Sequence, residues 1–433
     1  MKFVSFVPAV LAAAMFAAPA TAQTAGRTVI HAGQLMAEPG KPVRGASTII
    51  VENGRILSIA DGFQAAEPGA KLIDLKDKYV LPGLIDSHVH LTSDTGGLAG
   101  QLEDLTLSPA AQAFNAEING MKTLRAGFTT VRNLGDGDGA TLALRDAVAA
   151  GKVQGPRIVD AGLSISGTSG HMDGALGFRD ELRPHFDGAG NTCNGAEDCR
   201  RAVRQQIGRG ADVIKFASTG GVNSRIGAGL GKQMFDDEAQ AIVDTAHMFG
   251  KKVAVHAHGA DGIRLALSAG ADSIEHGTIL DEATIAAWAK SKTYYVPTLS
   301  TVNGYKERLA ANPDAYEPDV LAKIKWRISI TGKSLEQLVP RGVRIAFGTD
   351  AGVSKHGRNG DEFELMVQHG MTPLDAIKAA TVNAADLLGL ANEIGTIAPG
   401  KSADIIAVAS DPLADVRVLK SVAFVMAQGK VVD

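Results

Sequence analysis

Both ends of the chain carry the alternating apolar and polar positions of β-strands. From about residue 27 to 78 the pattern is β-like, and residues 48–59 predict a hairpin around an Asn53–Gly54 turn. Residues 403–408 and 422–432 have the same character. Neither end supplies enough strands for a core of its own. We therefore expect one small β-sandwich built from both ends, with the middle of the chain inserted between them.

The middle of the chain alternates short apolar runs with helical patterns, which is the βα signature of a parallel sheet. Residues 237–247, capped by Asp236, and residues 262–268 are predicted helices. Eight such units over roughly 300 residues fit an α/β fold of the (β/α)8 barrel type. An open doubly wound sheet is the alternative, but it would need a glycine-rich phosphate turn after the first strand. The candidate strands lie near residues 79–87, 128–133, 156–161, 212–217, 252–257, 272–276, 294–299 and 343–349.

The first residues have the composition of a secretory signal peptide. Lys2 provides the positive charge, Val7–Ala18 is an apolar run, and Ala20–Ala22 supply small residues around a cleavage point before Gln23. The apolar run is too short to span a bilayer, and no later stretch is long enough. We expect a periplasmic or secreted protein with no membrane association after cleavage, and an uncleaved anchor is the alternative. The predicted parts are a signal peptide at 1–22, the two portions of the β-sandwich at 23–82 and 391–433, and the barrel at 83–390.

The composition limits the classes of partner. The 433 residues are 45% apolar and 21% charged, with a net charge of −4, which is typical of a globular chain with one large domain and an accessory. There is no basic excess and no run of Lys or Arg, so we expect no nucleic-acid partner. Cys193 and Cys199 favour a disulfide in an oxidising compartment, although two free thiols also fit.

The most informative polar residues are His88 and His90, which follow the first apolar run of the barrel. Side chains at i and i+2 of a strand share a face, and neutral imidazole is the commonest side-chain metal ligand. Taken alone, the pair could equally be a polar face exposed to water. In a (β/α)8 barrel, however, the chemistry lies at the C-terminal ends of the strands. Other predicted strands carry or end in Lys215, His256, His258, His276 and Asp350.

Each of these residues also has a purely structural explanation. His256 and His258 could form an exposed polar face, and Asp350 could cap a following turn. Their convergence on one end of one barrel is what favours a metal site. For Lys215, burial would favour the neutral amine, which could add CO2 and become a carbamate that bridges two metal ions. Its spacing alone favours a lysine whose ammonium group reaches water.

At these residues the chain resembles the amidohydrolase superfamily, in the branch of imidazolonepropionase-like proteins, Xaa-Pro dipeptidases and related carboxypeptidases. It is especially similar to ochratoxin-hydrolysing amidohydrolases, and the resemblance runs from about residue 28 to the end. It implies two divalent metal ions, usually zinc, and a homo-oligomer, commonly an octamer. His88, His90 and Asp350 would hold one ion, His256 and His276 the other, and a carboxylated Lys215 would bridge them. The matching segments are 82–90, 213–215, 255–259, 273–277, 348–350, 371–385 and 395–404.

The reaction implied by the resemblance is attack of a metal-activated water on the amide bond of an N-acyl or aminoacyl amino acid. An example is the conversion of ochratoxin A to ochratoxin alpha and phenylalanine. Asp350 would move the proton to the leaving nitrogen, and His258 or His171 would help to polarise the carbonyl. Arg225 could clamp a substrate carboxylate, and His356, close to Asp350 in the chain, could contact the substrate or support the site. For His171 and Arg225, a loop position without function is the alternative. The remaining histidines, which we expect to be structural, are His31, His185, His247 and His369.

Two other functions remain open. A cyclic amidase or lactonase would keep this site and change the bond that is cleaved. A periplasmic metal-binding protein without catalysis would use the same imidazoles, but a ligand set completed by Asp350 argues against it.

Overall fold

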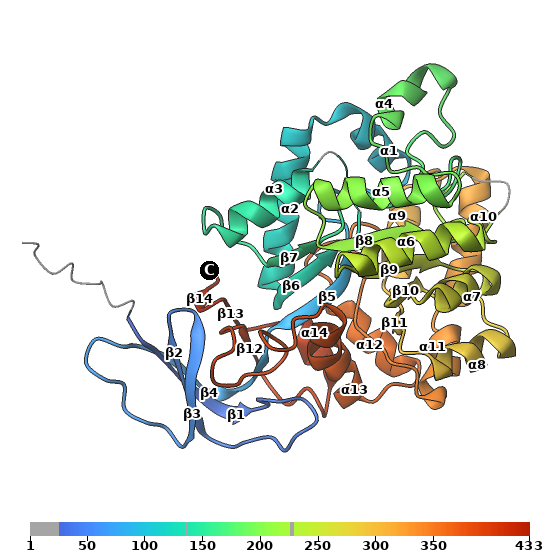
Figure 1. Ribbon diagram of the computed structural model, residues 1–433. Helices are drawn as coiled ribbons and strands as arrows, with labels where there is room; N and C mark the ends of the chain where they lie inside the picture. The colour runs from blue at the N-terminus through green and yellow to red at the C-terminus, as the bar shows by residue number, and fades with distance from the viewer. Residues whose placement is uncertain (1–25, 136, 138, 226–228) are drawn as a thin grey trace, which may run out of the picture.

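The computed structural model describes residues 26–135, 137, 139–225 and 229–433. A seven-stranded sheet lies at one end of the molecule, and two parallel sheets with surrounding helices form the rest (Figure 1). The predicted signal peptide and its cleavage point lie outside the described residues. The seven strands, in the order β14-β13-β12-β4-β1-β2-β3, come from both ends of the chain, as the sequence predicts. They are β1 (Thr28–Leu35), β2 (Ser47–Glu52), β3 (Arg55–Asp61), β4 (Lys71–Pro82), β12 (Ile405–Val408), β13 (Phe424–Ala427) and β14 (Lys430–Val431).

This small domain has one continuous mixed sheet where the sequence led us to expect a sandwich. The predicted hairpin is confirmed, because β2 and β3 pair antiparallel with Glu52 opposite Arg55. Both turn residues are left-handed, with φ of 52° at Asn53 and 78° at Gly54. This is the conformation of the two-residue turns that match the twist of a hairpin.

The predicted strand at 79–87 is in fact two strands. Residues up to Pro82 belong to β4, which pairs with β1 and, through Pro82 and Ile405, with β12. The chain then passes Gly83 and enters β5 (Leu84–Val89), the first strand of the parallel sheets. A Cβ at Gly83 would lie 2.2 Å from Thr129 Oγ1, so only glycine fits at this crossing without displacing its neighbour. The apolar pattern continues through the junction and therefore hides it.

The parallel strands form two sheets, in the orders β5-β6-β7 and β11-β10-β9-β8. Single bridges join their strands to the segments between the two sheets: Phe216 of β8 with Ile165, Tyr295 of β11 with Ile345, and Val89 of β5 with Ala351. The predicted strand at 343–349 is no regular strand here: its β-bridge in the described part of the chain is the isolated one between Ile345 and Tyr295. The described strands therefore approach the expected barrel without forming one continuous closed sheet. Their bounds are β6 (Phe128–Asn133), β7 (Arg157–Asp160), β8 (Val213–Ala217), β9 (Lys252–Ala257), β10 (Ser273–His276) and β11 (Tyr294–Val296).

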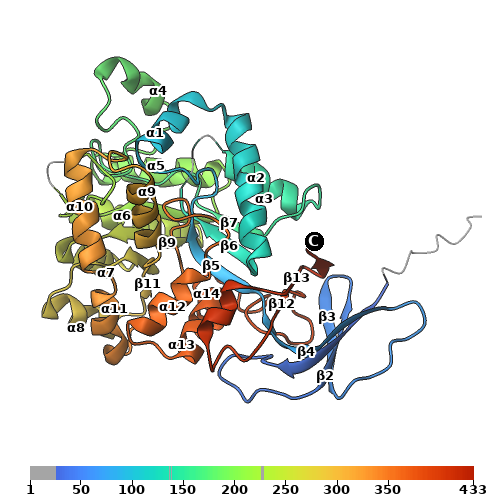
Figure 2. The same cartoon turned by 180° about the vertical axis from the view of Figure 1, so that it is seen from behind.

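Helices cover the outside of these sheets (Figure 2). The prediction at 262–268 is confirmed by α7. The prediction at 237–247 is confirmed by α6, but Asp236 is its first helical residue and not its cap; the cap is Phe235, whose backbone N–H donates to Glu238 Oε2 at 2.8 Å. The helices are α1 (Gly97–Thr106), α2 (Pro109–Arg125), α3 (Ala140–Ala149), α4 (Arg183–Asp187), α5 (Ala196–Gly208), α6 (Asp236–Met248), α7 (Ala260–Ala269), α8 (Glu282–Lys290), α9 (Thr301–Ala311), α10 (Pro318–Ser329), α11 (Lys333–Leu338), α12 (Asp361–Gln368), α13 (Pro373–Lys378) and α14 (Ala384–Leu387).

The core below the strand ends is aromatic and fully buried. Phe347 lies between Phe128 and Phe363, with ring centroids 5.3 Å and 4.4 Å away. Close packing of these rings fixes β6, the 343–349 segment and α12 relative to one another. None of the helices in the described part of the chain is long and apolar enough to cross a lipid bilayer.

Candidate metal centre

The residues predicted at the strand ends meet around one cavity of about 190 Å³. β5 delivers His88 and leads directly to His90, and β8 delivers Lys215. Asp350 comes from the extended segment beside β5, where its backbone N–H donates to the His88 carbonyl at 2.8 Å. The structure thus brings together side chains more than 250 residues apart in the chain. The predicted residues that line the cavity are His88, His90, His171, Lys215, His256, His258, His276 and Asp350.

The possible ligand atoms fall into two groups that share His276. In one group, atoms of His88, His276 and Asp350 all lie within 4.8 Å of one another, and in the other the same holds for His256, His258 and His276. Asp350 Oδ1 is 3.5 Å from His88 Nε2 and 3.3 Å from His90 Nε2. Two overlapping groups of imidazoles and a carboxylate match the donor types that zinc prefers.

Hydrogen bonds fix which ring nitrogen faces the cavity. His90 Nδ1 is 2.7 Å from the carbonyl oxygen of Gly135, and because a carbonyl only accepts, Nδ1 carries the proton. His88 Nδ1 donates to Glu275 Oε2 at 2.9 Å, and His276 Nδ1 is 2.7 Å from Thr298 Oγ1. Nε2 is then the nitrogen of each ring that could bind a metal ion, and in His88 and His90 it lies beside Asp350 Oδ1. This outer-shell support is the arrangement in which metal-binding histidines are normally held.

Burial keeps these imidazoles neutral, which is the form that binds a metal. Desolvation lowers the pKa of His88 to about 4, and the positive charge of Lys215 acts in the same direction. The pKa values of His256, His258 and His276 are also well below the ordinary value, mainly because the rings are buried. The site therefore offers neutral nitrogen lone pairs at neutral pH.

Lys215 is the least ordinary side chain of the site. It is 1% exposed, and its Nζ has no hydrogen-bond partner among the described residues. Burial lowers the pKa of its ammonium group to about 8, against the opposing attraction of Glu275 and Asp350. A buried amine without a partner is costly unless another group completes its surroundings. Its place in the cavity fits a side chain that is modified or held by an ion.

The backbone around the cavity is strained at three places. His276, Thr298 and Asp350 have positive φ values of 70°, 49° and 57° although none is glycine. Such residues persist only where the surrounding structure holds them, and they cluster at functional sites. Thr298 is also the hydrogen-bond partner of His276, so two of the three strained residues determine the orientation of the His276 imidazole.

Two buried carboxylates that the sequence analysis missed hold the site from outside the cavity. Glu275 is fully buried; besides His88, it accepts from Arg132 Nη2 at 2.9 Å. Asp86 accepts from the backbone N–H of His88 and from Thr349 Oγ1. Burial raises the pKa of Asp86 to about 6, although hydrogen bonds from Thr349 and others oppose the rise. Glu275 directly precedes His276 and Asp86 lies two residues before His88, but their side-chain partners Arg132 and Thr349 are 143 and 263 residues away from them.

The predicted substrate contacts have mixed outcomes. His171 lies in the cavity with its ring centroid 4.2 Å from that of His256. It fits there because Gly221 has no side chain; a Cβ at that position would lie 2.2 Å from the ring. His356 is outside the cavity lining, and its Nε2 donates to the His90 carbonyl at 2.9 Å, so it supports the site.

Arg225 is not brought to the cavity. Its guanidinium pairs with Glu317 at 3.1 Å and donates to Gln101 at 2.5 Å, both on the surrounding helical layer. The arginine that does line the cavity is Arg327, which sequence reasoning did not select, together with Tyr305. Both are on helices of the long segment after β11, where helical periodicity alone does not show which face meets the cavity.

Cys193 and Cys199 form a disulfide, with Cα atoms 4.9 Å apart and both residues buried. They lie before and within α5, away from the cavity lining. The four histidines expected to be structural are likewise absent from that lining. Two of them pair with acidic residues: His247 with Asp272 and His369 with Glu336.

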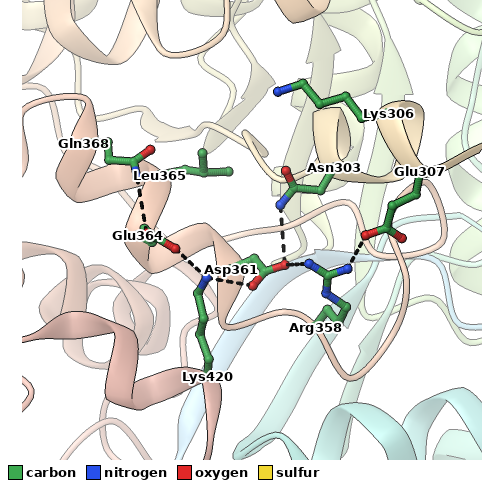
Figure 3. A pocket seen from close by; sticks show the side chains of 9 residues that line it. All are labelled: Asn303, Lys306, Glu307, Arg358, Asp361, Glu364, Leu365, Gln368 and Lys420. Atoms are coloured by element: carbon green, nitrogen blue, oxygen red, sulfur yellow. Dashed lines mark hydrogen bonds and ion pairs between the residues drawn. The ribbon is translucent and has the colours of Figure 1, made fainter. Parts of the chain in front are cut away.

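A second hollow, of about 330 Å³, lies between α9, α12 and Lys420 (Figure 3). Most of its charges pair with one another: Arg358 with Glu307 and Asp361, and Lys420 with Asp361 and Glu364. The hollow shares α9 with the metal centre. Because Arg358 pairs with Glu307 of α9 and Asp361 of α12, we interpret it as a surface ion-pair network that fixes α9 to α12.

One family and several known proteins match most of the chain. Residues 79–432 match the amidohydrolase family. The chain is 33% identical to an ochratoxinase from Aspergillus niger over 424 residues, which cover 93% of this chain and 86% of that protein. A solved Xaa-Pro dipeptidase with methionine in its active site has a TM-score of 0.87 at 37% identity, covering 94% of this chain and 99% of that one. A prolidase complexed with N-methylphosphonate-L-proline has a TM-score of 0.84 at 29% identity, with coverage of 94% and 99%.

Proposed function

The chain belongs to the amidohydrolase family, and from this premise we propose that it is a metal-dependent hydrolase that cleaves the amide bond of N-acyl or aminoacyl amino acids. The observation that carries the proposal is the convergence of oriented imidazoles, Asp350 and the unpartnered Lys215 on one small cavity. Relatives named as a dipeptidase, a prolidase and an ochratoxinase support a small amide or dipeptide substrate. We also propose that the two bridged parallel sheets are a (β/α)8 barrel whose strand ends carry the site.

The side chains fit two divalent ions, for which zinc is our proposal. His88, His90 and Asp350 would hold one, and His256 and His276 the other. The fit rests on the outer hydrogen bonds that hold Nδ1 of His88, His90 and His276, and on the buried amine of Lys215. The neutral amine of Lys215 would add to CO2 with loss of a proton, and the resulting carbamate would supply oxygen ligands to both ions. This converts a buried cation, which would repel metals, into an anion that attracts them.

Asp350 and His258 would then have different roles in the reaction. When bound, the ions would lower the pKa of a water and polarise the substrate carbonyl. Asp350 would accept the proton of that water and deliver it to the leaving amide nitrogen. His258 would donate a hydrogen bond toward the carbonyl oxygen as negative charge develops there. Its Nδ1 is held by Thr278 Oγ1 at 2.7 Å, which orients the ring for that role.

Hydrolysis of N-acetyl-L-phenylalanine by the purified protein tests the proposal. We expect turnover, its loss after treatment with a chelator, and its return when zinc is added. A protein that opened only cyclic amides or lactones would be the cyclic amidase or lactonase named above. A protein that bound zinc but turned over nothing in a broad amide panel would be a metal-binding protein without catalysis.

A further inference from the structure

Arg327 is a buried cation without an anionic partner. In the described part of the chain only two arginines are buried, Arg132 at 1% exposure and Arg327 at 4%. All three side-chain nitrogens of Arg132 donate hydrogen bonds: to Glu275, to Ser273 Oγ at 3.1 Å and to the carbonyl of Ser87 at 2.6 Å. Arg327 makes one long contact, from Nη2 to the carbonyl of Thr298 at 3.5 Å, and no described carboxylate lies within ion-pair distance of it.

A guanidinium group carries five N–H donors and stays charged at any physiological pH. Burying that charge without a partner is unfavourable, so a buried arginine is normally paired. Arg132 follows this rule, and Arg327 does not. Arg327 is one of the residues that line the cavity with the candidate ligands, and its hydrogen bond to Thr298 uses Nη2 alone, so the other donors have no partner among the described residues.

The helix that carries Arg327 is fixed in place. Val320 and Ile324 of α10 pack into a cluster with Tyr305 and Val222, which prevents the helix from turning the guanidinium outward. One turn before Arg327, Lys323 donates to the backbone carbonyl of Gly221 at 3.0 Å and so is already occupied. Of the two cations on this face of α10, Arg327 is the one left for a ligand.

The charges of the cavity lining also call for an anion. Asp350 is its only carboxylate among the described residues, and it lies against His88 and His90 at the metal centre. Arg327 is therefore not neutralised by the residues that would hold the ions. A carboxylate is the small anion whose two oxygens match the planar fork of a guanidinium.

We propose that Arg327 binds the free α-carboxylate of the substrate, so that the site selects amides whose leaving amino acid ends the chain. This inference rests on the proposed function. It adds that the α-carboxylate of the substrate is recognised, and that Arg327 recognises it. A neutral lactam or lactone would leave the guanidinium buried and unpaired, so the same contact disfavours the cyclic alternative. Arg327 also replaces Arg225 as the candidate for binding the substrate carboxylate, because Arg225 already pairs with Glu317.

The test compares N-acetyl-L-phenylalanine with N-acetyl-L-phenylalaninol, in which the carboxylate is a neutral CH2OH group. We expect the wild-type kcat/KM for the alcohol to be about 10²-fold or more below that for the acid, mainly through KM. Arg327→Met should lower kcat/KM for the acid by about 10²–10³-fold and change that for the alcohol by less than about threefold. The matched control is Arg204→Met, which removes the same charge from an exposed position and should leave both substrates unaffected.

Equal rates for acid and alcohol in the wild type, or equal losses for both in Arg327→Met, would overturn the inference while amide hydrolysis stood. If Arg327→Met does not fold, product inhibition of the wild-type enzyme tests the inference instead. L-phenylalanine should inhibit at least about tenfold more tightly than L-phenylalaninol. Equal inhibition by the two compounds overturns the inference. If no amide is cleaved, the proposed function fails. The carboxylate inference is then tested separately by calorimetric binding of N-acetyl-L-phenylalanine, which must be weaker in Arg327→Met than in the wild type. Equal binding would overturn it.

Discussion

Replacing Glu275 with glutamine tests how the metal centre is held, because it changes one oxygen of a fully buried carboxylate into an NH2 group. In the native protein Oε1 accepts from Arg132 and Ser273, and Oε2 accepts from His88 Nδ1. A glutamine keeps one accepting oxygen, so its NH2 must face a donor. If it faces His88, Nδ1 has to become the acceptor and the ring proton moves to Nε2, the nitrogen that would hold the metal.

The structure gives the size of the expected effect. Burial alone would raise the pKa of Glu275, but Arg132 and His88 outweigh burial and lower it to about 2 from its ordinary value of 4.5. At about 1.4 kcal/mol for each pKa unit, this shift corresponds to about 3 kcal/mol of stability. It agrees with the ~3–5 kcal/mol lost when one partner of a buried ion pair is removed. This stabilisation is present above pH 4.5 and is lost as the pH falls from 4.5 toward 2, where the native carboxylate becomes protonated.

We therefore expect Glu275→Gln to lower the free energy of unfolding of the metal-free protein by about 3 kcal/mol at pH 7 and to weaken zinc binding about 10–100-fold. Denaturant titration measures the first and calorimetric zinc titration the second. The control is Glu238→Gln, a buried carboxylate that accepts two backbone N–H groups, from Gly195 and Phe235, and has no arginine partner. It should cost only about 1 kcal/mol and leave zinc binding unchanged. A loss below about 1 kcal/mol in Glu275→Gln, with native zinc affinity, would refute the reasoning.

Three further predictions concern single residues. Lys215→Ala should abolish hydrolysis, and short carboxylic acids should restore part of it; restoration by amines instead would show that the lysine acts as a cation. His258→Ala should keep its zinc, measured by elemental analysis, but lose at least about 10²-fold in kcat; loss of an ion would mean that His258 and His256 exchange roles. Burial raises the pKa of Glu362 to about 7, against the opposing hydrogen bonds from the Leu299 and Ser300 backbone. Because its pKa in the unfolded chain is near 4.5, its contribution to stability should fall as the pH rises from 4.5 to 7. Glu362→Gln should flatten that part of the pH profile of unfolding, and an unchanged slope would contradict the raised pKa.

The candidate ligands could be predicted from the sequence because two simple rules act on them. Parallel strands end on the same side of a sheet, and residues at i and i+2 share a face. These rules place His88 and His90 together and bring Asp350 to the same end. They act on local patterns, which a sequence displays directly.

The supporting contacts could not be predicted, since they depend on long-range packing. Glu275 looks like an ordinary residue before His276, and only the fold brings Arg132 to it from another strand. Arg225 is a loop residue whose charge alone makes it a candidate, whereas Arg327 belongs to a helix whose inward face is decided by the burial of Val320 and Ile324. The same limit explains the missed break at Gly83, where the run of apolar residues is continuous but the chain changes sheets.

The pairing of β4 with β12 sets the order in which the molecule can be completed. β4 continues through Gly83 into β5, which carries His88 and leads directly to His90, yet one hydrogen-bonded neighbour of β4 is supplied by residues 405–408. During synthesis this edge of β4 stays unpaired until residues 405–408 have been made. A chain cut short before residue 405 would therefore leave β4, and through it β5 with the candidate ligand His88, without this pairing, so a stop codon there should disturb the candidate site.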